Sequence, residues 1–142
     1  MNENKHQLPV AREQVPHLLH GCGILPTAQR VEIAAIILSA EQHLSADQVL
    51  ARLRDTDARV SKATVYNTLG LFAEKGLVRE VIVDPTRVFY DSNMAPHYHF
   101  YNEDSGTLVD VPSAAIQLHG MPEPPIGTAM TGIDVIVRLR NT

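Results

Sequence analysis

The sequence predicts an α+β chain in two parts: a helical part closed by a β-hairpin, followed by a smaller α/β part. Apolar residues recur at helical spacing in three short segments between residues 27 and 76. Two β-rich runs follow, and three further strand-like runs lie beyond residue 96. We expect the first part to span residues 1–91 and the second residues 92–142.

Each of the three predicted helices starts at a side chain that can cap its first amides. Thr27 precedes the apolar run VEIAAIIL, and Ser61 precedes the run that ends in LGLF. Ser45 opens the segment SADQ, in which Gln48 can reach back to the amide of the cap residue, as in a capping box. Gly76 is expected to end the third helix, because glycine adopts the left-handed conformation without strain.

The runs LVREVIVD and RVFYD, joined at Asp84-Pro85-Thr86, predict a hairpin after the third helix. Three helices and a hairpin are the order of a winged helix-turn-helix domain, whose last helix enters the DNA major groove. Winged helices that bind protein share this order of elements. In a further alternative, Tyr66 is a core residue and Asn67 is an exposed polar residue without a function. The predicted DNA-binding residues are Thr27, Gln29, Arg30, Ser61, Lys62, Ala63, Thr64, Tyr66 and Asn67.

The second part is short and rich in strand-forming residues. HYHFYN, GTLVDVP and GIDVIVRLR predict three strands, and residues 112–125 are expected to contain a short helix before a proline-rich link. Such a part has little with which to cover its own sheet, so we expect a homodimer that shares it. A dimer would also bring two reading helices to the two halves of a palindromic site.

Composition limits the classes of function. The net charge of −4 excludes DNA binding by bulk charge alone, so any DNA contact must be local. Cys22 is the single cysteine, so neither an intrachain disulfide nor a four-cysteine zinc site can form within these residues. The polar start and the lack of an apolar run of about 20 residues favour a cytoplasmic protein without membrane contact.

A set of histidines and carboxylates has the spacing of metal ligands. His97 and His99 stand two apart, which on a strand places both rings on one face. Asp110 falls on the neighbouring strand if the turn lies at residues 102–106, and Asp91 and His43 can approach from the first part. Nitrogen and oxygen donors without a thiolate favour Fe(II), Mn(II) or Zn(II), one ion per subunit.

The segments PTAQR, HLSADQVL, ATVYNTL and HYH together resemble the ferric uptake regulator family over most of residues 20–140. The forms ATVYNTL, VFYDSN, GTLVDVP and DVIVRLR are most similar to the Irr-type iron response regulators within that family. The resemblance implies a metal-responsive transcriptional repressor of iron homeostasis that binds a palindromic, AT-rich operator as a homodimer. It places the regulatory site, which joins the two domains, on His43, Asp91, His97, His99 and Asp110.

The sequence also departs from the family pattern. The two CxxC pairs that hold structural zinc in many members are absent, so we expect no such zinc. The histidine triplet implicated in haem binding by Irr-type members is reduced to His97-Tyr98-His99, and Cys22 is followed by Gly23 in place of the proline of the Cys-Pro haem motif. Both departures argue against haem, which ranks below a metal ion as the alternative signal. Leu25 stands where a basic residue often precedes the first family helix.

Three other functions remain open from the sequence. A peroxide-sensing repressor would use an iron or manganese site and suffer oxidation at His43 or His97. A non-haem metalloenzyme would use two histidines and a carboxylate to activate oxygen. A winged helix that binds protein would have lost its DNA contacts. The predicted reading helix has no purpose in an enzyme, and we therefore expect a regulator.

Overall fold

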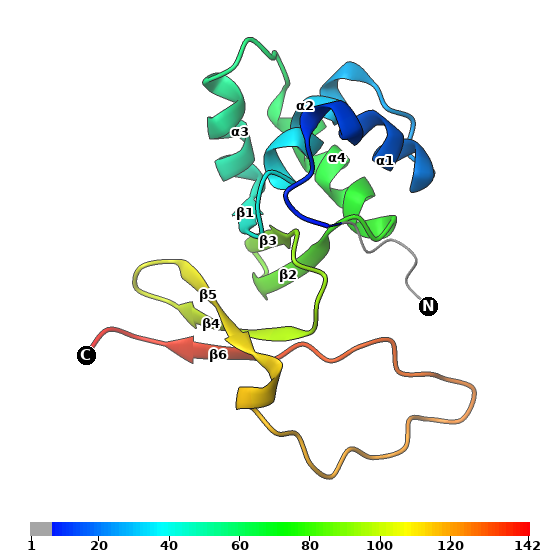
Figure 1. Cartoon of the computed structure of the whole chain (residues 1–142). Coiled ribbons are helices and arrows are strands. Elements are labelled where there is room, and N and C mark those ends of the chain that lie inside the picture. Colours follow the sequence, from blue (N-terminus) through cyan, green and yellow to red (C-terminus); the bar gives the residue numbers. More distant parts are fainter. Residues whose placement is uncertain (1–6) are drawn as a thin grey trace. The chain divides into compact units, whose positions relative to one another are not determined.

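The computed structural model describes residues 7–142, which form two compact units (Figure 1). The first unit ends at Met94 and the second begins at Ala95. The first contains all four α-helices of the described residues and a three-stranded sheet, and the second contains another three-stranded sheet. We describe each unit by itself.

The helices of the first unit begin where the sequence predicts caps. Thr27 Oγ1 accepts a hydrogen bond from the Arg30 amide at 3.3 Å. Ser45 and Gln48 exchange two bonds of 2.8 and 3.2 Å, which confirms the capping box. Gly76 has a φ of 76°, as its predicted role requires. The elements are η1 (Arg12–Gln14), α1 (Val15–Gly21), α2 (Ala28–Ile37), α3 (Ala46–Arg54) and α4 (Lys62–Glu74).

Two short elements of this unit were not expected from the sequence. Helix α1 has seven residues, too few for a clear helical period, although it buries Val15 and Leu19. Strand β1 (His43–Ser45) has three residues and joins the predicted hairpin of β2 (Arg79–Asp84) and β3 (Arg87–Asp91). The strand order is β1-β3-β2, so the wing is anchored through β1 to the segment that starts α3.

One apolar cluster holds the first unit together and orients α4. Val65, Leu69 and Phe72 of this helix are fully buried. Burial of side chains of this size stabilises the folded state by about 1.5–3 kcal/mol each. Because these residues point inward at helical spacing, the opposite face of α4 is left exposed. The cluster also includes Leu19, Ile33, Ile37, Val49, Leu53 and Leu77.

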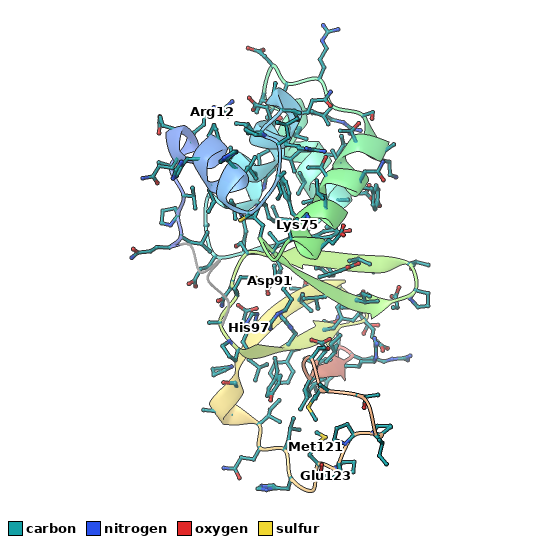
Figure 2. The ribbon with its side chains drawn as sticks, turned by 90° about the vertical axis from the view of Figure 1, so that its right-hand side faces the viewer. Arg12, Lys75, Asp91, His97, Met121 and Glu123 are labelled. Carbon is teal, nitrogen blue, oxygen red and sulfur yellow. The ribbon has the colours of Figure 1, made fainter. Side chains whose placement is uncertain are left out.

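The second unit is a sheet of β4 (His97–Asn102), β5 (Thr107–Pro112) and β6 (Ile136–Leu139), in the order β5-β4-β6. Strands β4 and β5 are antiparallel, whereas β6 runs parallel to β4. A long segment links β5 to β6, and its Met121 and Glu123 carry exposed side chains (Figure 2).

The helix expected within residues 112–125 is wrong. The structure has only the 3-10 turn η2 (Ser113–Ala115) there, and the described chain then continues without regular structure to β6. Pro122, Pro124 and Pro125 lack amide hydrogens and Gly120 takes a positive φ, so an α-helix cannot continue through this stretch. Among the described residues, no helix is both long and apolar enough to span a bilayer.

Candidate metal and nucleic-acid sites

Two histidines of the second unit share one face of its sheet. His97 and His99 are both buried, whereas Tyr98 between them is half-buried and belongs to the other face. Their ring centroids are 4.6 Å apart and the ring planes meet at 69°. This arrangement follows from the two-residue period of a strand, which returns every second side chain to the same face.

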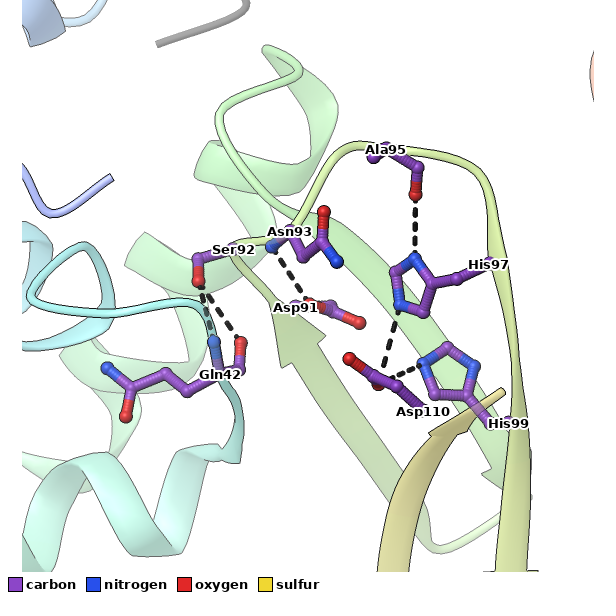
Figure 3. Close-up of polar contacts among 8 residues, drawn as sticks. All are labelled: Gln42, Asp91, Ser92, Asn93, Ala95, His97, His99 and Asp110. Carbon is purple, nitrogen blue, oxygen red and sulfur yellow. Dashed lines mark hydrogen bonds and ion pairs between the residues drawn. The ribbon is translucent and has the colours of Figure 1, made fainter. Parts of the chain in front are cut away.

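Asp110 faces this pair from the neighbouring strand. It is the register partner of His99, and its Oδ1 lies 3.6 Å from His97 Nε2 and 3.4 Å from His99 Nε2 (Figure 3). Donors about 2.1 Å from a tetrahedral zinc ion stand about 3.4 Å from each other. The three side chains thus have the spacing that a small divalent cation needs.

The environment of His97 favours one tautomer of its ring. Its Nδ1 lies 2.7 Å from the carbonyl oxygen of Ala95 (Figure 3). Because a carbonyl oxygen can only accept, Nδ1 carries a hydrogen, and in the neutral ring Nε2 then holds the lone pair. A hydrogen bond of this kind orients the imidazole for a metal bond at the other nitrogen. Nε2 is therefore the ring nitrogen of His97 that can bind a metal ion.

The first unit brings the other two predicted ligands to adjacent strands. Asp91 ends β3 and is the register partner of His43 in β1. The Asp91 carboxylate is fully buried and its Oδ1 accepts a hydrogen bond of 2.9 Å from the Asn93 amide. The His43 ring packs edge-on against Phe89, with centroids 6.1 Å apart. The two residues thus occupy fixed positions on one sheet.

Ser92, which was not predicted from the sequence, fixes the end of β3 through hydrogen bonds. Its hydroxyl donates to the Ala40 carbonyl at 2.7 Å and accepts from the Gln42 amide at 3.1 Å. The Ser92 amide also donates to the Gln42 carbonyl at 2.9 Å. These bonds hold the residues beside His43 and Asp91 in place. Fifty residues separate Ser92 from Gln42, so no local pattern could have revealed the contact.

The exposed face of α4 carries the residues predicted to read DNA. Tyr66 is 43% exposed, so the alternative that places it in the core is wrong. The ammonium of Lys62 lies 5.8 Å from the centroid of the Tyr66 ring and 3.3 Å from Asp47 Oδ1. Ala63 and Asn67 are also exposed, and Thr64 is half-buried. Side chains of α4 are therefore free of the core where a groove-reading helix needs them.

Residues of α2 line a groove of about 350 Å³ beside α4, together with Thr64 and Asn67. Thr27 is exposed at its edge. The side-chain amide of Gln29 donates to the Arg59 carbonyl at 3.4 Å. The Arg30 guanidinium donates to the Leu25 carbonyl at 3.0 Å. Gln29 and Arg30 thus brace the local backbone.

Two titratable side chains of this unit have shifted pKa values. Burial raises the pKa of Tyr90, and the charge of Glu80 and the nearby Tyr66 raise it further. Burial also raises the pKa of the Cys22 thiol, which is half-buried. A raised thiol pKa lowers the thiolate fraction, so the position of Cys22 does not favour thiolate chemistry.

Comparison with known sequences gives a consistent family. The model described as "Ferric uptake regulator family" matches residues 22–120. A similar protein is the "Peroxide-responsive repressor PerR" of Staphylococcus aureus (strain Mu50 / ATCC 700699), which is 34% identical over 92 residues. The match covers 65% of this chain and 62% of that protein, so the matched part spans less than two thirds of the relative's length.

Comparison with solved structures supports the same fold. The ferric uptake regulator of Pseudomonas aeruginosa with manganese is 24% identical and has a TM-score of 0.68, with 89% of this chain and 97% of that chain covered. The regulator of Francisella tularensis with iron is 22% identical and has a TM-score of 0.65, with 84% and 92% covered. These similarities confirm the predicted α+β fold class.

Proposed function

Because the chain belongs to the ferric uptake regulator family, we propose that it is a metal-responsive, DNA-binding repressor that controls iron homeostasis. The family resemblance recognised in the sequence is thereby confirmed, and a family of regulators supports a regulator over a metalloenzyme. The Irr-type assignment remains part of the proposal. A DNA-binding regulator works where the chromosome is, so we expect it in the cytoplasm.

The observation that carries this proposal is the set of His97, His99 and Asp110, whose nitrogen and oxygen donors meet at metal-ligand spacing. A divalent cation would supply the positive charge that holds these ligands together. Two relatives of known structure contain manganese and iron, which are compatible with such donors. We propose one Fe(II), Mn(II) or Zn(II) per subunit, with haem as an alternative signal.

We further propose that His43 and Asp91 complete the ligand set from the first unit. Six residues separate Asp91 from His97 in the chain, so their Cα atoms can never be more than about 21 Å apart. This short tether keeps the two half-sites at a high local concentration. Ligation by both units would favour one arrangement of the winged helix, and through it one state of the DNA-binding dimer.

In the DNA complex, the exposed face of α4 would lie in the major groove. Asn67 is suited to an adenine edge, and Thr64 and Tyr66 to thymine methyl groups, whereas Ser61 and Lys62 are suited to phosphates. Ala63, Thr27, Gln29 and Arg30 complete the surface that we assign to DNA. These preferences favour an AT-rich operator, and a dimer favours a palindromic one.

A homodimer is supported by the second unit. Phe100 and Val109 are cross-strand partners, and both side chains are exposed on the face opposite the two histidines. Exposed apolar neighbours of this kind mark association surfaces. We expect Val109→Asp to convert the dimer to a monomer in analytical ultracentrifugation. If the Val109→Asp variant remains a dimer, the dimer interface does not include this face of the sheet.

The proposal can be tested with a duplex selected from a random-sequence pool in the presence of Mn²⁺. The variant His97→Ala/His99→Ala should lose Mn²⁺ affinity by roughly 100-fold or more, with loss of metal-dependent DNA retardation. His119→Ala, which removes an exposed histidine of the same unit, is the matched control. Unchanged metal affinity in the double variant would overturn the site, and a failure to select any duplex would overturn the DNA function.

Peroxide sensing is a second candidate, because the matched relative is a peroxide-responsive repressor. If it is correct, Fe(II)-loaded protein treated with hydrogen peroxide should gain one oxygen atom on the peptide of His43 or His97. The Mn(II)-loaded protein should not gain it. Peptide mass spectrometry separates the outcomes, and elemental analysis with an absorption spectrum of the purified protein distinguishes iron, manganese, zinc and haem.

A further inference from the structure

A concave pocket lies where α3 ends and α4 begins. Its volume is about 540 Å³, and Leu53 and Val60 contribute to its apolar wall. Three cationic side chains surround the opening: Arg54 from the last turn of α3, Arg59 from the connecting turn, and Lys62 from the start of α4. Neither arginine is among the DNA-binding residues predicted from the sequence.

The lining of this pocket is positively charged. None of the described residues that line it is a carboxylate. Within residues 7–142, no ion pair engages Arg54 or Arg59, whereas Lys62 has the exposed Asp47 as its partner. Asp55 and Asp57 belong to the same turn but do not line the pocket. In a chain with a net charge of −4, this local excess of positive charge is a distinct feature.

The backbone that carries Arg59 is held in position. The Gln29 side chain of α2 donates a hydrogen bond of 3.4 Å to the Arg59 carbonyl. The Ser61 hydroxyl accepts from the Thr64 amide at 3.1 Å and fixes the start of α4. The backbone that carries Arg59 is therefore fixed, which reduces the backbone entropy lost when an anion binds.

The ligand chemistry follows from these groups and from their neighbours on α4. Guanidinium groups bind phosphate oxygens in a bidentate manner. Tyr66 lies four residues after Lys62, about 6 Å further along the helix axis. A helix that reads a groove has the sugar-phosphate backbone at its flanks. Residues near its N-terminus reach base edges, whereas cations of the preceding helix and turn are placed to meet phosphates.

We propose that Arg54, Arg59 and Lys62 form a seat for backbone phosphates of the DNA at the edge of the groove that α4 enters. This inference rests on the proposed function, because it assigns phosphate contacts to that same surface. The seat fixes the register of α4 on the duplex and contributes affinity that does not depend on base sequence. Asp47 weakens the seat by its ion pair with Lys62.

The test compares the variant Arg54→Gln/Arg59→Gln with the wild type as full-length, metal-loaded protein. Fluorescence anisotropy is measured from 50 to 200 mM KCl on the selected duplex and on a scrambled duplex of equal composition. Each phosphate contact contributes about 0.9 to the slope of log K against log[salt], so the slope should fall by about 1 to 2. Affinity should fall by similar factors, on the order of tenfold, on both duplexes.

Lys75→Gln is the matched control, because it removes one exposed cation at the opposite end of α4. It should leave the slope unchanged. An unchanged slope in the double arginine variant, or a loss confined to the selected duplex, would overturn the phosphate seat while the DNA function stands. Wild-type protein that binds neither duplex would overturn the DNA function and the seat together. A circular dichroism melt confirms that each variant is folded.

Discussion

The two units of this chain are stabilised in different ways. The first buries a continuous apolar cluster that joins all four of its helices, and side chains cap three of them. The second has three short strands, and its buried side chains are Tyr101, Leu108, Val111 and the two histidines His97 and His99. A large fraction of the buried set in the second unit is therefore polar and able to bind a ligand.

This difference indicates which unit depends on something outside itself. Small units bury a low fraction of their surface and commonly need a metal, a disulfide or a partner for stability. Cys22 is the single cysteine of the chain, so a disulfide within it is not available to the second unit. We expect the stability of the helical core of the first unit to depend little on metal and dimerisation, and the stability of the second unit to depend on both.

The largest effect should come from the core of the first unit. Phe72 is fully buried on α4, and Phe72→Ala should lower the free energy of unfolding of this unit by about 3–5 kcal/mol. Phe100→Ala, in the exposed face of β4, should cost less than about 1 kcal/mol in the monomer. Urea denaturation followed by circular dichroism measures both. Equal costs would contradict the contrast between the units.

The next effect should be largest in the second unit, which holds three of the five proposed ligands. Saturating Mn²⁺ at about 100 times its dissociation constant should stabilise the second unit by about 2.7 kcal/mol. His99→Ala should abolish this stabilisation, whereas His119→Ala should retain it. Hydrogen exchange of β4 and β5 amides, with and without metal, reports the change. Stabilisation restricted to the α2–α4 amides would place the ion elsewhere.

A smaller effect should come from the helix caps. Ser45→Ala removes one bond of the capping box of α3 and should cost about 1 kcal/mol. Ser113→Ala, at the start of η2, should cost almost nothing, because no side-chain hydrogen bond caps that turn. Thermal melts of the two variants provide the comparison. A large cost at Ser113 would show that η2 has a stabilising role of its own.

The sequence predicts the elements whose signals are local. The caps at Thr27, Ser45 and Ser61 lie within three residues of the amides they serve, and the wing is marked by its turn. The two-residue period of a strand predicts that His97 and His99 share one face. The turn predicted at residues 102–106 places Asp110 on the neighbouring strand, where the structure pairs it with His99. Their role as ligands remains a prediction.

Features that depend on contacts between distant residues could not be predicted. Strand β1 is too short to have a period and exists because it pairs with β3. The contact of Ser92 with Gln42 spans fifty residues. The pocket with Arg54 and Arg59 forms where α3 packs against α4, and a local sequence pattern cannot predict such packing. The helix predicted within residues 112–125 is wrong because Pro122, Pro124 and Pro125 cannot donate the backbone hydrogen bonds of a helix.

The turns of the two hairpins differ in the chemical type of their side-chain acceptor: a carboxylate in the wing and an amide in the β4–β5 turn. In the wing, Asp84 Oδ1 accepts hydrogen bonds of 2.8 Å from both the hydroxyl and the amide of Thr86. In the β4–β5 turn, Asn102 Oδ1 accepts from the amides of Asp104 and Ser105 at 2.9 and 3.0 Å. In both turns a side-chain oxygen of the first residue accepts two hydrogen bonds, but only the acceptor in the wing is a carboxylate that can be protonated.

The smallest expected effect is a dependence of the Asp84 hydrogen bonds on pH, which the hydrogen bonds to Asn102 Oδ1 lack. The Thr86 hydroxyl, and next its amide, hold the pKa of Asp84 below its ordinary value. The stabilisation is therefore complete above the ordinary aspartate pKa of about 3.9 and is lost as the pH falls through the lower folded value. Carboxyl-carbon NMR shifts should show the Asp84 pKa rising toward the ordinary value in Thr86→Val. The side chain of Asn102 is an amide and should show no such titration. An Asp84 pKa that does not change in Thr86→Val would mean that another group, such as the nearby Arg87, lowers it.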